Sequence, residues 1–332
     1  MTLTRRMLMA TSAAAFALTA MPLRAQEPIV IKFSHVVAPE TPKGKGAEKF
    51  KQLAEEYTDG RVTVDVYPNS QLYKDKEELE ALQMGAVQML APSLAKFGPL
   101  GVGDFEVFDL PYIFPDRTAL QKVTSGEVGD ALLAKLEPKG ITGLAYWDNG
   151  FKIMTANSPL RMPEDFLGQK MRIQSSKVLE AQFQALGAVP QVMAFSEVYQ
   201  AMQTGVVDGS ENTPSNVYTQ KMHEVQKHAT VSNHGYIGYA VIVNKAFWDG
   251  LPDDVREQLD RAMVDASEYA NSIAQDENAA ALQAIRDAGT TEVHEQTPEE
   301  REAWMAELES VYAEMESRIG KETIEMVRSA TR

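Results

Sequence analysis

A regular alternation of short apolar runs and helix-like segments constrains the fold of this chain more than any other feature. Val62, Val64 and Val66 fall on one face of a run that alternates as a strand does. The expected strands of this first unit are 29–37, 62–67 and 87–91, and the expected helices are 44–57 and 76–85. Strands and helices that follow one another in this way predict an α/β fold with a parallel sheet.

The pattern starts again after residue 140 and predicts a second unit of the same kind. Its expected strands are 141–146, 152–156, 170–174, 189–194 and 206–210, with helices at 177–187 and 196–204. Ser196 suits the N-cap of the second helix, and Gly205 suits its end. Two α/β units joined near residue 150 predict two lobes, each a sheet flanked by helices, on either side of a cleft.

The last third of the chain consists mostly of helix formers. After one more strand at 234–244, a helix is expected at 252–288, with Pro252 in its first turn. At about 1.5 Å per residue it would extend about 55 Å, enough to brace both lobes even if it breaks midway. Thr297 and Glu300 form a capping box for a further helix. The expected boundaries are 26–149 plus 238–277 for the first lobe, 150–237 plus 278–305 for the second, and 306–332 for the C-terminal helices.

The first 25 residues have the features of a cleaved signal peptide, which predicts export to the periplasm. Arg5 and Arg6 precede an uncharged apolar stretch, 7–20, and a cleavage site follows Ala25. That stretch is too short for a membrane-spanning helix, which argues against an uncleaved anchor. The paired arginines leave the twin-arginine and the general secretory routes both open.

Charge and cysteine content exclude several classes of function. The chain has 32 Lys and Arg against 47 Asp and Glu, and the leader holds three of the arginines and no acid, so the mature net charge is near −18. Such a charge opposes binding to nucleic acid or to anionic lipid. The chain contains no cysteine, which excludes disulfides, thiolate nucleophiles and thiolate metal sites.

Enzyme and cofactor motifs are also missing from the sequence. The two segments that begin like a dinucleotide fingerprint hold Lys49 and Glu106 where the third glycine is needed. There is no P-loop, no nucleophile elbow and no HExxH. We therefore expect no catalytic residue, no metal site and no cofactor. The five histidines do not have the spacing of a metal site, since none belongs to an HExxH motif and a helix would place His223 and His228 on different faces. They are His35, His223, His228, His234 and His294.

Arg172 is the strongest candidate for ligand binding. It lies on a short apolar strand that is followed by Ser175 and Ser176, and a guanidinium fork suits a carboxylate. From the residues alone, an ordinary salt bridge, for instance to Glu211, is an equal alternative. Asn212 ends a second strand nearby.

Three segments of this region, together with their order, resemble the solute-binding subunits of TRAP (tripartite ATP-independent periplasmic) transporters, in particular the dicarboxylate-binding branch. They are GQKMRIQSS (168–176), MAFSEVYQAMQTG (193–205) and VDGSEN (207–212). The resemblance extends from Ile29 to near the C-terminus. It implies a two-lobed periplasmic binding protein fold without enzymatic activity. It also implies that Arg172 holds the ligand carboxylate and that Asn212 donates a hydrogen bond to it.

A dicarboxylate would need a second cation, because a buried unpaired charge costs several kcal/mol. Lys43 and Lys96 are the leading candidates, with His35 and Ser93 close by at the expected ligand-facing edge of the first sheet. Lys152 stands where sialic-acid-binding relatives carry a second arginine, and its role is open. The other expected contacts are the aromatic residues Trp147, Phe195 and Tyr236, of which Phe195 also matches the family.

The resemblance implies a monomeric receptor that closes on a C4-dicarboxylate such as malate, succinate or fumarate. The closed form would be recognised by a TRAP membrane permease that uses an ion gradient. A keto acid or a sugar acid is the alternative ligand, and an exported hydrolase is the alternative from another class. Gly150 and Gly238, at the expected crossings between the lobes, are either hinges or simple strand ends.

Overall fold

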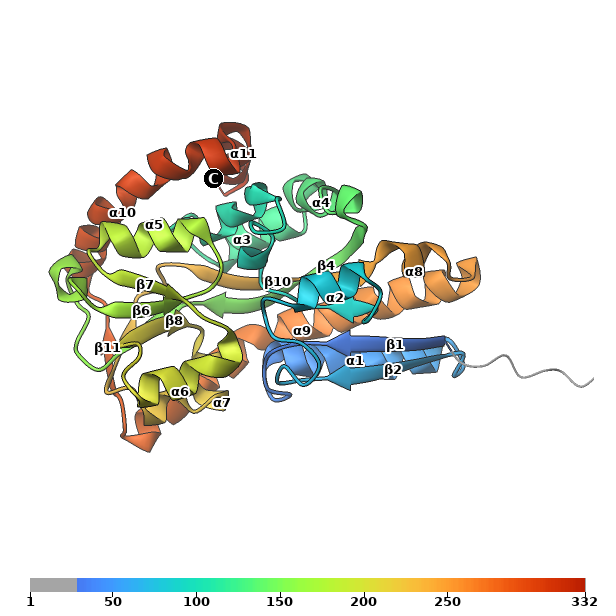
Figure 1. Cartoon of the computed structure of the whole chain (residues 1–332), viewed down its shortest axis with the longest axis horizontal. Helices are drawn as coiled ribbons and strands as arrows, with labels where there is room; N and C mark the ends of the chain where they lie inside the picture. Colours follow the sequence, from blue (N-terminus) through green and yellow to red (C-terminus); the bar gives the residue numbers. More distant parts are fainter. Residues whose placement is uncertain (1–28, 332) are drawn as a thin grey trace, which may run out of the picture.

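The computed structural model describes residues 29–331, so the predicted signal peptide (1–25) lies outside the described residues. Within 29–331 the strands form two sheets, with the orders β2-β1-β3-β10-β4 and β11-β9-β5-β8-β6-β7. Figure 1 shows them side by side, with helices packed around both. The α/β prediction is confirmed.

The first sheet combines parallel and antiparallel pairs. β1 pairs in parallel with β2 and β3, whereas β10 pairs antiparallel with β3 and β4. β10 is buried along its whole length, as its apolar sequence requires of a strand that is covered on both faces. The strands are β1 Ile29–Ser34, β2 Val62–Tyr67, β3 Met89–Leu90, β4 Ile141–Phe151 and β10 Tyr236–Asn244.

The second sheet is built mainly from residues 153–231. β6 lies between β8 and β7 in parallel, and β5 lies antiparallel between β8 and β9. The strands are β5 Ile153–Ala156, β6 Lys170–Ile173, β7 Val189–Val192, β8 Gly209–Asn212, β9 His228–Val231 and β11 Glu292–Glu295. The chain passes from the first sheet to the second between β4 and β5, and returns just before β10.

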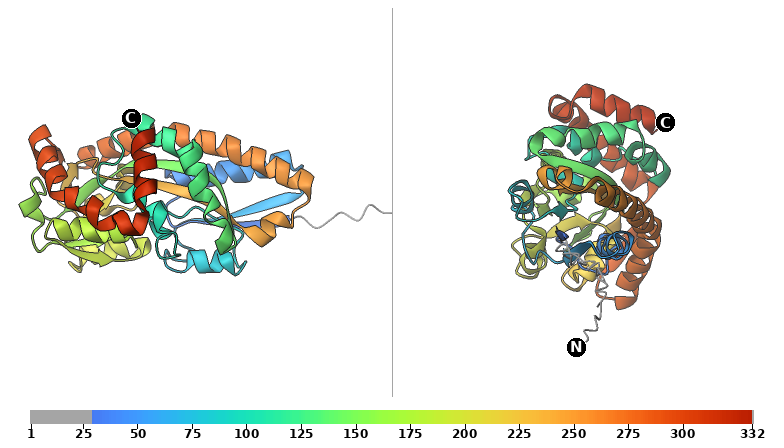
Figure 2. Two further views of the ribbon diagram at one scale, coloured as in Figure 1. Left: turned by 90° about the horizontal axis from the view of Figure 1, so that it is seen from above. Right: turned by 90° about the vertical axis from the view of Figure 1, so that its right-hand side faces the viewer.

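The long helix α9, Asp253–Ala288, packs against both sheets. On the side of the first sheet it contacts helix α1 and strand β4, and on the side of the second sheet it contacts helix α7 and strand β11. It is one continuous helix, which confirms the predicted brace, although Pro252 is its N-cap rather than a first-turn residue. Figures 1 and 2 show α9 running past both sheets, with α10 and α11 on the opposite side of the molecule from α1.

The remaining helices cover the sheet faces and connect the strands. The α-helices are α1 Pro42–Tyr57, α2 Glu78–Gln83, α3 Arg117–Thr124, α4 Glu127–Ala134, α5 Lys177–Ala185, α6 Val198–Gln203, α7 Pro214–Thr219, α8 Lys245–Asp249, α10 Pro298–Ile319 and α11 Lys321–Ala330. Short 3₁₀ turns are η1 Leu94–Lys96, η2 Gly103–Asp109, η3 Glu137–Lys139, η4 Pro163–Phe166, η5 Phe195–Glu197 and η6 Met222–Glu224. The predicted capping box at Thr297 and Glu300 is confirmed.

Several predicted element ends were wrong. Ser196 is not an N-cap, because it lies inside the 3₁₀ turn η5, and α6 begins only at Val198. The strand predicted at 206–210 is β8, which begins at Gly209 and extends to Asn212, because its pairing with β5 begins there. Asn212 is the last residue of this buried strand, as expected from the sequence.

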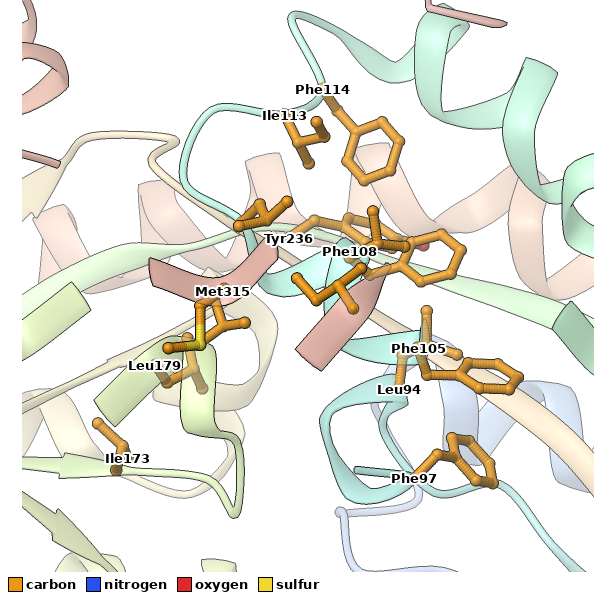
Figure 3. Packing of buried hydrophobic residues seen from close by; sticks show 14 of the residues in the cluster. Leu94, Phe97, Phe105, Phe108, Ile113, Phe114, Ile173, Leu179, Tyr236 and Met315 are labelled. Carbon is orange, nitrogen blue, oxygen red and sulfur yellow. The ribbon is translucent and has the colours of Figure 1, made fainter. Parts of the chain in front are cut away.

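An aromatic core fills one side of the molecule and links the two sheets. Phe108 stacks on Phe114 at 5.7 Å, and the edge of Phe114 meets Tyr236 at 5.9 Å. Figure 3 shows this group continuing towards Leu179 of α5 and Met315 of α10. The two sheets therefore share a hydrophobic core on the side opposite α9.

Candidate functional site

A small pocket lies where the ends of strands from both sheets meet. The residues that line it come from three places, and the first two are called the two sides of the pocket below. The strand β1 to η1 part of the chain, around the first sheet, contributes Val36, Val37, Lys43, Asp75, Ser93 and Lys96; the second sheet and its connections contribute Arg172, Gln174, Phe195, Asn212 and Asn216; and β10 contributes Ile237 and Tyr239. Val36 and Val37 follow β1, and Gln174 follows β6. Carboxyl ends of parallel strands are the usual ligand edge of α/β sheets.

Arg172 enters the pocket from β6 with its charge unpaired. Its side chain is buried, and both Nε and Nη2 donate to the carbonyl of Met193, at 3.1 and 2.9 Å. Within residues 29–331 no carboxylate forms an ion pair with it, and Glu211 pairs with Lys152 instead. Burial lowers the pKa of Arg172. The carboxylates of Asp75 and Glu211 act on Arg172 only through longer-range attraction, so its guanidinium can still form direct bonds to an incoming carboxylate.

Asn212, at the end of β8, is oriented as a donor. Its Oδ1 accepts from the Thr213 backbone N–H at 2.9 Å and from Asn216 Nδ2 at 2.8 Å. No hydrogen bond of its own Nδ2 is found within residues 29–331. The side-chain amide therefore presents N–H groups to the pocket, as a carboxylate ligand requires.

Lys43 is a second buried cation without an acid partner. Its Nζ donates to the carbonyl of Ala91 at 3.0 Å and lies 3.7 Å from the centre of the Tyr239 ring. Among the described residues it forms no ion pair. Burial, and then repulsion from Lys96, lower the pKa of Lys43 to about 7. The first turn of α1 brings it here, because Thr41 caps the helix and Gly44 packs directly on the backbone of Ala38 and Pro39.

Lys96, in contrast, is neutralised within the protein. Its Nζ contacts the carboxylates of Asp75 and of Glu78, the latter at 2.5 Å. Burial acts to raise the pKa of Asp75, but Lys96 and Arg172 overcome this effect and hold it at about 2. Two acids on one ammonium leave Lys96 little attraction for a third.

Two hydrogen bonds cross the pocket between the sides. Asp75 accepts from the backbone N–H of Phe195, and the Ser93 hydroxyl donates to Gln174. The guanidinium of Arg172 lies 5.8 Å from the Phe195 ring. These contacts close the pocket over its charged residues.

The structure brings six of the predicted site residues into this one pocket: Arg172, Asn212, Lys43, Ser93, Lys96 and Phe195. Ser175 lines an adjoining cavity that shares Asp75 and Arg172 with it. His35 is buried behind the pocket, where burial and then Lys43 lower its pKa to about 3.

Three predicted residues lie elsewhere. Trp147 is buried against Phe33 in the core, and its indole N–H donates to Ser267 at 2.8 Å. Tyr236 belongs to the aromatic core. Lys152 is fully buried, 2.7 Å from Glu211 and 4.0 Å from Asp109. None of the three lines the pocket.

Four polar residues that line the pocket were not predicted from the sequence: Asp75, Gln174, Asn216 and Tyr239. Asp75 lies in a run of charges, KDKEE (74–78), that reads as a solvated surface. Asn216 follows Asn212 by four residues, and its contact with Asn212 depends on the start of α7. Tyr239 occurs in a strand whose other residues are nearly all apolar.

Neither a metal cluster nor a membrane span is found in the described part of the chain. No three or more His, Asp or Glu side chains within 29–331 are grouped to hold an ion. No helix among these residues is both long and apolar enough to cross a bilayer.

Two sheets connected by the chain between β4 and β5 and again before β10, with a cation-rich pocket between them, have the architecture of a two-lobed solute-binding protein. More specifically, the chain belongs to the DctP family (bacterial extracellular solute-binding protein, family 7), which matches residues 33–318. The predicted relationship to TRAP solute-binding proteins is confirmed.

Individual relatives resemble the chain over nearly its whole length. It is 73% identical over 330 residues to the C4-dicarboxylate-binding periplasmic protein DctP of Rhodobacter capsulatus, with 99% of each chain covered. A TRAP periplasmic solute binding protein from Shewanella oneidensis with bound succinate has a TM-score of 0.90 at 44% identity, over 92% of this chain and 100% of that one. Another, from Pseudomonas aeruginosa with bound L-malate, has a TM-score of 0.84 at 43% identity, over 86% and 100%.

Proposed function

We propose that this protein is a periplasmic receptor that binds a C4-dicarboxylate, such as succinate, malate or fumarate, and delivers it to a TRAP membrane permease. The observation that carries the proposal is a pair of buried cations in one pocket, Arg172 and Lys43, neither of which forms an ion pair with an acid of residues 29–331. The relatives named above support the same ligand class.

In the proposed complex, the guanidinium of Arg172 and the Nδ2 of Asn212 hold one carboxylate. Lys43 holds the other carboxylate from α1, on the opposite side of the pocket. Lys96 is the weaker candidate for this role because Asp75 and Glu78 already neutralise it. A ligand with two charges would satisfy both free cations, which is the condition for burying them together.

A keto acid or sugar acid with one carboxylate is the less favoured ligand. It would leave either Arg172 or Lys43 buried without a carboxylate partner, at a cost on the order of several kcal/mol.

Closure of the lobes is part of the proposal. The pocket draws residues from both sides, so a ligand that touches Lys43 and Arg172 is fully desolvated only when the sides meet. Gly150 has φ +118° and lies where the chain leaves the first sheet, which suits a hinge. We propose that the protein acts as a monomer and that the permease recognises its closed form.

Calorimetry with matched acids tests the proposed ligand class. Succinate should bind far more tightly than butyrate, which keeps the chain length but lacks one charge. Lys43→Met should remove most of this difference, whereas Lys49→Met, on the same helix but outside the pocket, should keep it. Equal affinity of the wild-type protein for succinate and butyrate would mean that the second carboxylate stays in solvent, and the proposal would fail.

Small-angle scattering tests the closure. A saturating concentration of succinate should reduce the radius of gyration, and butyrate should leave it unchanged. An unchanged radius with a ligand that binds would indicate a pocket that is closed beforehand.

A further inference from the structure

Asn278, on the long helix α9, contacts both parts of the molecule through one side-chain amide. Its Nδ2 donates to the carbonyl of Asn149, at the end of β4, and to Ala274 at 2.7 Å. Its Oδ1 accepts from the backbone N–H of Ser215 in α7 at 3.0 Å. A single residue of the long helix α9 is thus hydrogen-bonded both to the end of β4 in the first sheet and to the start of α7, next to the second sheet.

The bond to Ser215 completes the start of α7. The first N–H groups of a helix have no partner within the helix, and the N-cap side chain usually supplies one. Thr213, the N-cap of α7, makes no such bond. The Oδ1 of Asn278 therefore acts as a cap that is supplied from another helix.

The start of α7 is continuous with the ligand site. Thr213 donates its N–H to Asn212 Oδ1 at 2.9 Å, and Asn149 Nδ2 donates to Thr213 Oγ1 at 2.7 Å. These bonds, with those of Asn278, form a polar chain from α9 through Asn149 and Thr213 to Asn212. Together with the bond from Asn216 Nδ2 to Asn212 Oδ1 at 2.8 Å, this chain fixes which atoms of Asn212 face the pocket.

Gly150 is adapted to the same contact. A Cβ at this position would lie 3.0 Å from the Nδ2 of Asn278, and the φ of +118° is one that other residues rarely adopt. The crossing strand and Asn278 are therefore fitted to each other at the point where the chain leaves the first sheet.

We infer that Asn278 is a positioning residue of the binding site, through which α9 sets the orientation of Asn212 and its place relative to the crossing strand. This inference rests on the proposed function only for the identity of the ligand. Asn278 does not line the pocket and touches no ligand-binding residue directly.

Asn271 provides a matched control on the same helix. It also bonds to the backbone of β4, accepting from the N–H of Asp148 at 2.7 Å and donating to Tyr146 at 3.1 Å. It has no bond to α7. Asn271→Ala and Asn278→Ala should therefore both lower the melting temperature, whereas only Asn278→Ala should disturb Asn212.

The experiment combines succinate calorimetry with NMR of the side-chain amide of Asn212 in the ligand-free protein. Asn278→Ala should weaken succinate binding by up to about tenfold, because the free energy with which the cap ordered the start of α7 must then be supplied when the ligand binds. It should also shift the Asn212 amide resonances. Asn271→Ala should leave both unchanged. Asn278→Asp, which keeps the acceptor for Ser215 but loses the donor to Asn149, should restore part of the affinity.

Each other outcome overturns a defined part of the argument. Equal losses of affinity in the two alanine variants would make Asn278 an ordinary structural contact. Unshifted Asn212 resonances in Asn278→Ala would reject the positioning role, whatever the ligand. Failure of the wild-type protein to bind any C4-dicarboxylate would remove the proposed function, and the NMR comparison would still decide the role of Asn278.

Discussion

Two buried basic regions of this molecule differ in how their charge is balanced. Beside the aromatic core, Lys152 lies 2.7 Å from Glu211, whose other oxygen is 2.9 Å from His234, and Ser232 is 2.6 Å from the same imidazole. In the pocket, the hydrogen bonds that Arg172 and Lys43 donate within the described part of the chain all go to backbone carbonyls. All of these side chains are buried, so burial alone does not mark a binding site. The feature that we propose marks the binding site is a buried cation whose hydrogen-bond partners are uncharged.

The pKa values follow the same division. Burial acts to raise the pKa of Glu211, but Lys152 and His234 overcome this effect and hold it at about 2. In the pocket, burial and then Lys96 lower the pKa of Lys43 to about 7. The balanced region stabilises its charges by itself, and the pocket leaves charges that a ligand can stabilise.

Removing the pocket arginine should have the largest effect. Arg172→Ala should lower affinity for succinate by several hundred-fold or more, since a buried carboxylate left unpaired costs about 3–5 kcal/mol. Arg172→Lys should also bind poorly, because an ammonium cannot reproduce the guanidinium geometry. Calorimetry measures the loss, and a cooperative unfolding transition verifies the fold. Near wild-type affinity of the alanine variant would rule out the proposed role.

Breaking the balanced region should affect stability. Glu211→Gln removes the nearer carboxylate from Lys152 and leaves only Asp109 at 4.0 Å, so it should lower the free energy of unfolding in urea by up to about 3–5 kcal/mol. Because the pKa of Glu211 is depressed in the folded protein, its contribution is present above about pH 4.5 and is lost as the pH falls towards 2. The difference from wild type should shrink over this range. Glu292→Gln, at an exposed position, is the control, and an equal effect there would refute the prediction.

The pH dependence of binding distinguishes the two regions further. A dianion binds the charged form of Lys43, so affinity for succinate should fall as the pH rises above about 7, by up to tenfold per unit. The other titratable groups around Lys43 are Lys96, Glu78, Asp75, His35 and Tyr239. Elsewhere in the protein, burial raises the pKa of Asp109 to about 7, so this carboxyl group would titrate in the same pH range. The comparison with Lys43→Met isolates the contribution of Lys43, because that variant should lose this dependence. A profile unchanged in Lys43→Met would assign the titration to another group.

An exposed ion pair at the edge of the pocket should have the smallest effect. Lys74 and Glu197 lie 2.8 Å apart from opposite sides, with side chains 49% and 50% exposed. Lys74→Met should change affinity for succinate by less than about threefold, and added salt should abolish the change. A large effect that persists in salt would place this pair in the closing mechanism.

The fold was predictable because it depends on local patterns: the strand and helix periods indicate two α/β units and the long helix α9. Arg172 was predicted as a ligand contact only through the family resemblance of the GQKMRIQSS segment, because the residues alone left an ordinary salt bridge equally open. The central place of β10 was not predictable, since its pairing with β3 and β4 depends on residues about a hundred or more positions away. That pairing, with α9 packed on β4, explains why Trp147 lies in the core.

The two candidate lysines show the limit of the sequence most clearly. Lys43 and Lys96 both follow a strand of the first sheet, and nothing local separates them. The loop before α2 brings Asp75 onto Lys96, and the first residue of α2 brings Glu78 there, so that among residues 29–331 Lys43 forms no ion pair whereas Lys96 forms two. Charge balance is a property of the tertiary structure, and sequence spacing does not reveal it.

The threading of the chain through both sheets also has a consequence for folding. β10 joins β3 to β4, and α9 packs on α1, about two hundred residues earlier in the sequence. The first sheet therefore cannot be completed until the C-terminal third of the chain is available. Such long-range pairing slows folding, because large loops must close before their contacts form. Neither half of the molecule is a self-sufficient folding unit, and both should be lost in one unfolding transition.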